Sequence, residues 1–249
     1  MTNKIIKIIL PAIILSALQI LIFSSTSFSE VRYSKHDLSI GGPRFTFDTD
    51  EVCVFCHTPH KAIVVDSAIP PNRLPLWNRS ISGNEVGFTV YSSTTLNAAP
   101  SQPRSMTLLC MSCHDGTSAL NVVQNFRGVQ TTFGFYGSNT ADQIEDVYYP
   151  GAVSYPGANI GESANKDLSN DHPVSFVYDS ALASSDGSLV TPFSTSFVDN
   201  LKKLPLFNGR LECATCHNPH EQGNEVDGTS PFLRMSNTNS EMCIKCHNK

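Results

Sequence analysis

Every cysteine in the chain belongs to one of four Cys-x-x-Cys-His motifs. Two cysteines three residues apart on a helical turn face the same side, so both can form thioethers with the two vinyl groups of one porphyrin. The histidine that follows can supply a nitrogen to the iron. The spacing predicts four covalently attached c-type haems, at Cys53, Cys56 and His57; Cys110, Cys113 and His114; Cys213, Cys216 and His217; and Cys243, Cys246 and His247.

Two other uses of paired cysteines compete with haem. A tetrathiolate zinc site accepts two Cys-x-x-Cys pairs, but it gives no reason for a histidine after each pair, and the intervals between these motifs are long and uneven. A structural disulfide framework is the second alternative, although Cys-x-x-Cys pairs are more often redox-active than structural. The repeated histidine favours haem over both.

The chain has eight histidines, and four of them lie outside the motifs: His36, His60, His172 and His220. Four irons need four sixth ligands, so the match in number predicts two axial histidines for every haem. Methionine is the competing sixth ligand, and four methionines lie near motifs: Met106, Met111, Met235 and Met242. With a histidine for each iron, these methionines are expected to pack against porphyrins.

His60 and His220 occupy the same position in an extended Cys-His-x-Pro-His motif. A histidine three residues after the proximal histidine rises only about 4.5 Å along a helical turn, so its ring cannot reach the opposite face of its own haem. It must then serve another haem, which predicts closely spaced porphyrins suited to electron hopping. The alternative is a turn histidine ordered by the proline before it.

The N-terminus has the features of a secretory signal peptide. Lys4 and Lys7 precede an apolar run over 8–23, and Ser27-Phe28-Ser29 offers a small-x-small cleavage site. The run is shorter than the roughly 20 residues that span a bilayer. We therefore expect a cleaved signal peptide at 1–29, a single tetrahaem cytochrome domain at 30–249, and no transmembrane segment in the mature chain.

Charge and composition narrow the partners and the fold. Residues 1–29 carry two lysines and no acidic residue, so their removal changes the formal charge from -5 to -7 and disfavours nucleic acid as a partner. With 15 Gly and 15 Pro, the chain has few periodic stretches. The expected fold is a multihaem cytochrome c with the haems as its core, mostly loops with short α-helices and little β-sheet. A hairpin is expected within 129–136.

The motifs form an N-terminal pair and a C-terminal pair, separated by a long haem-free stretch over 115–212. Its aromatic residues, Phe126 and Phe133 among them, are expected to cover porphyrins, to form a subunit contact or to pack in a core. His172 lies in this stretch, where Asn170, Asp171 and Pro173 predict a turn that presents its imidazole. A partial repeat relates 74–79 to 204–210, out of register with the haem motifs.

The chain resembles the extracellular multihaem cytochromes that form conductive filaments, of the OmcE and OmcS type. The motifs that carry this resemblance are His-Asp-Leu-Ser at 36–39, the two Cys-His-x-Pro-His motifs, Asp-His-Pro-Val-Ser-Phe at 171–176 and the C-terminal Cys-x-x-Cys-His. The resemblance implies a filament with an unbroken chain of bis-histidine haems, in which His36 ligates a haem of the neighbouring subunit. It implies as partners further copies of the chain, other multihaem cytochromes and extracellular electron acceptors.

Three functions remain open from sequence. The first is a secreted conductive filament at the cell surface that carries electrons to external acceptors. The second is a monomeric periplasmic electron shuttle, in which His36 ligates within its own chain. The third is a multihaem redox enzyme, which would need one iron with an open position and hence one of the four extra histidines away from iron. We expect an electron carrier and not an enzyme.

Overall fold

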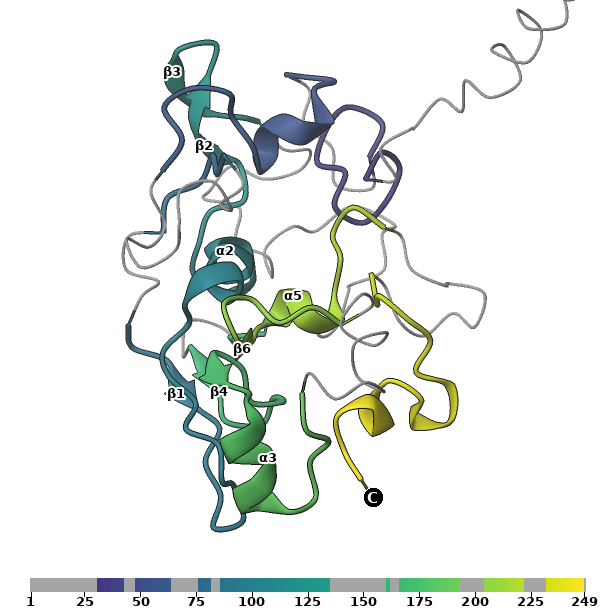
Figure 1. The fold of residues 1–249 in the computed structure, drawn as a ribbon. Coiled ribbons are helices and arrows are strands. Elements are labelled where there is room, and N and C mark those ends of the chain that lie inside the picture. The colour runs from purple at the N-terminus through teal and green to yellow at the C-terminus, as the bar shows by residue number, and fades with distance from the viewer. Residues whose placement is uncertain are drawn as a thin grey trace, which may run out of the picture.

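A computed structural model of the chain describes residues 31–42, 48–63, 76–81, 86–134, 160–161, 166–192, 204–221 and 232–248. The predicted signal peptide at 1–29 lies outside these ranges, whereas all eight cysteines and all eight histidines lie inside them. Figure 1 shows short elements joined by long connections. No described helix is long and apolar enough to cross a membrane.

The helices and strands are short. The helical elements are η1 (Val52–Phe55), α2 (Ser105–His114), α3 (Ser180–Asp186), α5 (Cys213–Cys216), η4 (Thr238–Ser240) and η5 (Cys243–Lys245). The strands are β1 (Thr89–Val90), β2 (Val122–Phe126), β3 (Val129–Thr132), β4 (Asp167–Leu168), β5 (Phe176–Val177) and β6 (Arg210–Leu211). They form three two-stranded sheets, of which β1–β4 is parallel and both β2–β3 and β5–β6 are antiparallel.

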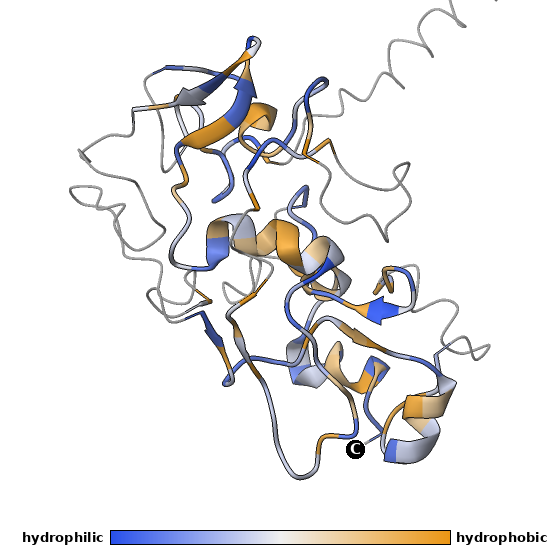
Figure 2. Cartoon of the chain, turned by 90° about the vertical axis from the view of Figure 1, so that its left-hand side faces the viewer, coloured by the Kyte–Doolittle hydropathy of each residue, from blue (hydrophilic) through white to orange (hydrophobic). Residues whose placement is uncertain are grey.

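Helix α2 lies at the centre of the molecule (Figure 1). Its buried residues include Thr107, Leu108, Leu109 and Met111, which point in several directions around the helix axis. A helix buried on most of its circumference needs neighbours on several sides, and α5 is one of them. Figure 2 shows hydrophobic residues along α2, with hydrophilic residues at one of its ends.

The hairpin β2–β3 differs from the sequence prediction. Its strands pair in antiparallel fashion, with the turn at Arg127 and Gly128, whose φ angles are 53° and 100°. Two consecutive positive φ angles give the turn a twist that matches paired strands, and glycine adopts one of them freely. The hairpin predicted within 129–136 is therefore wrong in its bounds, because β3 ends at Thr132 and the first strand lies before the turn.

The buried apolar residues of the described chain form four small clusters, and three of them include haem-motif cysteines. One cluster joins Phe55, Val123 and Phe133, with Phe126 and Cys113 packed against it. Phe126 and Phe133 thus contribute to a local core. A second cluster, around Met111, contacts Cys110 and Cys213, and a third, around Tyr178, contacts Cys246. The predicted haem-cored fold remains a prediction, since these clusters are protein side chains only.

Polar side chains also fill the interior. Asn78 is fully buried, and its amide nitrogen donates to the carbonyl oxygens of Val54 (2.6 Å) and Asn125 (2.9 Å). Its amide oxygen accepts from the backbone N–H of Asn125 at 2.7 Å. The hydrogen bonds of this one buried side chain thereby link the first haem motif to β2.

Replacing Asn78 with alanine should leave three buried backbone groups without partners and lower the free energy of unfolding by roughly 2 to 5 kcal/mol. Chemical denaturation of the purified protein measures this change. Asn97→Ala is the matched control, because the Asn97 amide also donates one hydrogen bond, to Asp186, but at the surface. Its effect should stay within about 0.5 kcal/mol. Equal effects of the two substitutions would contradict the role of Asn78.

Candidate functional site

Each haem motif sits on a short helical turn. The first lies on η1, the third on α5 and the fourth on η5, and the second forms the last turn of α2. In the first, third and fourth motifs the histidine N–H donates to the carbonyl oxygen of the first cysteine, at 2.8 to 3.0 Å. Helical geometry puts both cysteines of a pair on one side, which is what attachment to a single porphyrin requires.

A second backbone segment holds the first motif in place. The N–H of Thr58 donates to the carbonyl of Leu76 at 2.7 Å, and the N–H of Asn78 donates to the carbonyl of Cys56 at 2.9 Å. His57 and Trp77 therefore face each other as an antiparallel bridge. The ring of Trp77 meets the His57 ring edge-on, with centroids 5.9 Å apart.

The third motif is held in the same way. The N–H of Asn218 donates to the carbonyl of Phe232 at 2.8 Å, and the N–H of Arg234 donates to the carbonyl of Cys216 at 2.9 Å. The side chain of Arg234 donates to the carbonyl of Ala214 at 2.7 Å. That carbonyl corresponds to the one at Val54 that accepts from Asn78, so the two sites match in backbone and in side-chain contact.

The fourth motif has this backbone arrangement too, with the bridging segment earlier in the chain. Asn248 donates to Ser188 at 2.8 Å and Val190 donates to Cys246 at 2.9 Å, which places His247 opposite Leu189. We call this two-bond arrangement around the motif histidine the histidine clamp. It holds the histidine backbone in an extended conformation, as at His217, whose φ and ψ are -112° and 142°.

The second motif has no such clamp among the described residues, and its histidine ends a regular helix. The carbonyl of His114 accepts from the N–H groups of Ile160 and Gly161, at 3.0 and 3.1 Å. A Cβ at Gly161 would lie 2.4 Å from the carbonyl oxygen of Asp115, so glycine is required for this close approach.

The sequence did not reveal these clamps. It suggested that 74–79 corresponds to 204–210. In the structure, 76–78 clamps the first motif and 232–234 clamps the third, and each of these segments follows its motif in the chain. The only available signals were a position after a Cys-His-x-Pro-His motif and an apolar residue opposite the histidine, both too weak to detect without the backbone contacts.

The motifs lie beside one another in chain order. The thiols of Cys56 and Cys113 interact electrostatically, which contributes to a raised pKa at Cys56 after the larger effect of burial. Cys110 and Cys213 are within hydrogen-bonding reach of each other. The thiols of Cys216 and Cys246 interact in the same manner as the first pair. Each motif therefore lies near the next one along the chain.

Most of the cysteine thiols are held neutral. Burial raises the pKa of Cys216 and of Cys246 to about 11, and burial also raises the pKa of Cys113. Cys213 departs from this trend, because its hydrogen bond with Cys110 lowers its pKa. A thioether sulfur carries no charge, so surroundings that disfavour a thiolate suit it.

Three of the four extra histidines lie opposite motif histidines. The ring centroids of His57 and His220 are 5.9 Å apart, with an angle of 20° between the rings. Those of His36 and His114 are 6.1 Å apart, and those of His172 and His247 are 6.4 Å apart. The histidines therefore lie near one another in pairs. The described residues contain no group of three or more His, Cys, Asp or Glu side chains placed to hold a metal ion.

His172 is presented by an exposed turn, and its Nδ1 lies 2.9 Å from the carbonyl of Pro173. A ring fixed through Nδ1 leaves Nε2 as the nitrogen that can ligate a metal. His36 is held differently, since the ring of Phe232 packs on it with centroids 4.2 Å apart. Both rings are therefore oriented by their own surroundings.

The structure does not bring His60 to a motif histidine other than its neighbour His57. His60 is exposed and borders a cavity of about 920 Å³ that Cys53 and His57 also line. Lys61 and Arg127 border the same cavity. His217 is exposed as well, and it lies close enough to His36 to influence the charge of that ring. Among the methionines, Met111 and Met235 are buried.

No family model and no curated protein matches this chain. The functional interpretation therefore rests on the motifs and on the geometry described above.

Acidification should destabilise the fold through His36. Burial, followed by the charges of His114, His217 and His220, lowers the pKa of the His36 imidazole from 6.5 to about 3. Below pH 6.5 the unfolded chain binds a proton that the folded chain does not accept until about pH 3, so stability falls as the pH falls through this window.

Replacement of His36 with glutamine removes this contribution. The denaturation midpoint of H36Q should therefore decrease less than that of the wild type between about pH 7 and about pH 4. Stability should also fall with falling pH when a metal is bound, because a ligating imidazole must also be neutral. An equal decrease in both proteins would show that His36 is not buried in a neutral form.

Proposed function

We propose that this chain is an electron-transfer protein that carries four covalently attached c-type haems, each with two axial histidines. The observation that supports this most strongly is the spacing of three histidine pairs, whose ring centroids lie 5.9, 6.1 and 6.4 Å apart. Haem iron supplies reversible one-electron chemistry when it is bound. The motif cysteines would attach it, and the histidine pairs would ligate its iron.

The spacing fits an iron between two imidazoles. With metal–nitrogen bonds of about 2 Å on each side, two axial imidazoles hold their ring centres roughly 6 Å apart. Ring pairs in direct contact cover a wider range, about 4.5 to 7 Å, and the three separations here fall in a narrow part of it. In each pair one histidine comes from a Cys-x-x-Cys-His motif and the other from the four extra histidines, which is the combination that the sequence predicts.

The succession of the motifs supports electron transfer along the chain. Porphyrins attached at Cys56 and Cys113, at Cys110 and Cys213, and at Cys216 and Cys246 would be neighbours, because these cysteines already interact in pairs. The rigid clamp at three of the four motif histidines favours fixed orientations. Fixed ligands and short separations suit electron hopping, which requires little rearrangement at each site.

We further propose that the secreted protein forms an extracellular filament that conducts electrons to external acceptors. The support is the resemblance to filament-forming cytochromes, together with the position of His36 on an N-terminal segment, 31–42, that exposes Tyr33 and Ile40. If the pair between His36 and His114 forms between neighbouring chains, each subunit inserts its segment into the next. Such an exchange does not close on itself and produces a polymer.

The monomeric periplasmic shuttle is the second candidate, and one observation favours it. In the single chain His36 already lies beside His114, so the second haem can obtain both axial ligands without a partner. The two candidates share the same haem sites and differ only in whether this histidine pair forms within one chain or between two.

Two measurements on protein secreted by the native cells test the proposal. Intact mass and haem absorbance should give four haems per chain, and electron microscopy should show ordered polymers. Four haems on discrete particles at every concentration would leave the shuttle as the function. Zinc, or cysteines without haem, would overturn the electron-transfer proposal itself.

Replacement of His172 with alanine should convert one haem of the four to the high-spin ferric form, because the iron opposite His247 loses its sixth ligand. Electron paramagnetic resonance of the oxidised protein measures the fraction. Ser169→Ala changes an exposed side chain on the same turn and should leave all four haems low-spin. A spectrum of H172A identical to that of the wild type would mean that His172 is not an axial ligand.

A further inference from the structure

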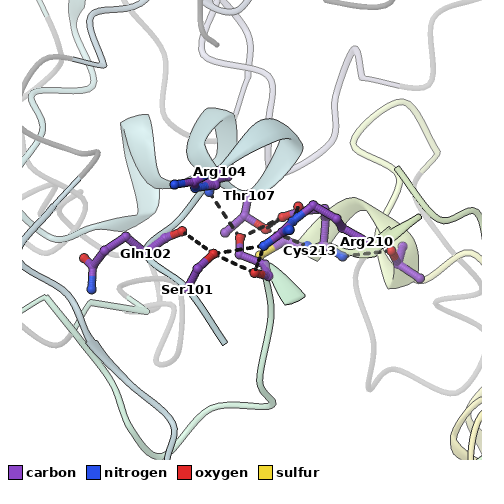
Figure 3. A network of polar contacts seen from close by, with 9 residues as sticks. Ser101, Gln102, Arg104, Thr107, Arg210 and Cys213 are labelled. Carbon is purple, nitrogen blue, oxygen red and sulfur yellow. Dashed lines mark hydrogen bonds and ion pairs between the residues drawn. The ribbon is translucent and has the colours of Figure 1, made fainter. Parts of the chain in front are cut away.

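Glu212 occupies an unusual position for an acidic residue. It immediately precedes Cys213, and it is fully buried (0% exposed) where α5 packs against α2. Figure 3 shows three of its neighbours, Thr107, Arg210 and Cys213, converging from α2, β6 and α5 on one polar network. Acidic residues are rarely buried to this extent without a full set of partners.

The partners of Glu212 satisfy one of its two oxygens. Oε2 accepts hydrogen bonds from the hydroxyls of Thr107 and Ser175, the latter at 2.8 Å. Oε1 is buried without a hydrogen-bond partner, and the nearest cation is Nε of Arg210, 3.7 Å away. That nitrogen is also buried without a hydrogen-bond partner, because the hydrogen bonds of Arg210 run from Nη2 to Ser101 and Ser175.

Part of the network is structural. Glu212 and Thr215 form a capping box at the start of α5, with the N–H of Glu212 donating to the Thr215 hydroxyl at 3.0 Å. The Thr107 hydroxyl accepts from the N–H of Cys213 at 3.1 Å. A cap requires a hydrogen-bond acceptor, but it requires neither full burial nor a carboxyl oxygen left without a donor. The cap alone therefore does not account for Oε1.

The titratable and charged groups around Glu212 come from three elements. Arg210 faces it from β6, Cys110 from α2, and Cys213 from α5. Asp171, from the loop before β5, acts on Cys213. Cys110 and Cys213 are the cysteines at which the second and third haems attach in the proposed function. The carboxyl group of Glu212 therefore lies at the junction of two haem sites.

Burial raises the pKa of Glu212 above its ordinary value, against the effect of its two hydroxyl donors and Arg210. Burial therefore favours the protonated state, whereas the hydroxyl donors and Arg210 favour the charged state. A single added or removed charge nearby can then decide between them, since charges interact strongly in an interior of low polarity.

We propose that Glu212 takes up one proton when a haem attached through Cys110 or Cys213 is reduced, so that electron transfer at this junction is coupled to proton uptake. The inference rests on the proposed function. A one-electron donor supplies one electron, and this electron converts ferric to ferrous iron. Water supplies one proton, and this proton binds to Oε1. No bond to the porphyrin forms or breaks.

The coupling follows from electrostatics. Reduction removes one positive charge from the neighbourhood of the carboxylate, which makes its buried negative charge less favourable. By linkage, protonation of Glu212 must favour reduction by the same free energy. The potential of one or two of the four haems should therefore fall as the pH rises, by up to about 59 mV for each tenfold decrease in proton concentration.

Spectroelectrochemical titration of the holoprotein over a range of pH tests the proposal. Glu212→Gln keeps the shape and a hydrogen-bond acceptor but cannot titrate. The pH-dependent component of the haem potentials should therefore disappear. Glu221→Gln, at an exposed position in the described chain, is the matched control and should retain the component. A pH dependence in E212Q equal to that of the wild type would overturn the proposal.

A second variant keeps the test decisive if E212Q does not assemble. Ser175→Ala removes one hydrogen-bond donor to Oε2. The pH range over which the haem potential depends on pH should therefore move to higher pH. An unchanged range would also overturn the proposal. A wild-type chain without haem would instead refute the proposed function, and haem absorbance distinguishes that failure from a lack of proton coupling.

Discussion

A pair of imidazoles can share an iron only if both rings are held a fixed distance apart. In this chain backbone contacts, and not a large core, hold the motif histidines. Three motif histidines sit in the same clamp, in which the N–H after the histidine and the carbonyl before it are both bound to a second segment. Peptide bonds and paired backbone groups are stiff, so the clamp fixes the backbone from which each of these rings projects.

The polar interior follows from the same constraint. Segments that clamp the motifs approach from distant parts of the sequence, and the motif carbonyls that they bury need donors. Asn78 and Arg234 supply such donors at equivalent places. Glu212 belongs to the same set of buried polar side chains, although its Oε1 accepts no hydrogen bond. The small apolar clusters pack against haem-motif cysteines, where porphyrin faces would extend them.

The sequence was informative where chemistry is local. The spacing of Cys53, Cys56 and His57 is enough to predict haem attachment, and the short helical turns follow from the same pattern. The histidine pairs could not be predicted in this way, because the approach of His220 to His57 depends on the whole fold. The hairpin was misplaced for a simpler reason: the alternation that includes Phe133 extends beyond the strand, and the turn is marked by a Gly after Arg127.

The most direct test of the central claim is a density map of the mature protein with its cofactors, at a resolution that separates each iron from its ligands. The proposed function predicts iron between His57 and His220, between His36 and His114, and between His172 and His247, with the second pair drawn from one chain or from two neighbours. Irons ligated by methionine or left with one histidine, or cysteines bound to zinc, would contradict it.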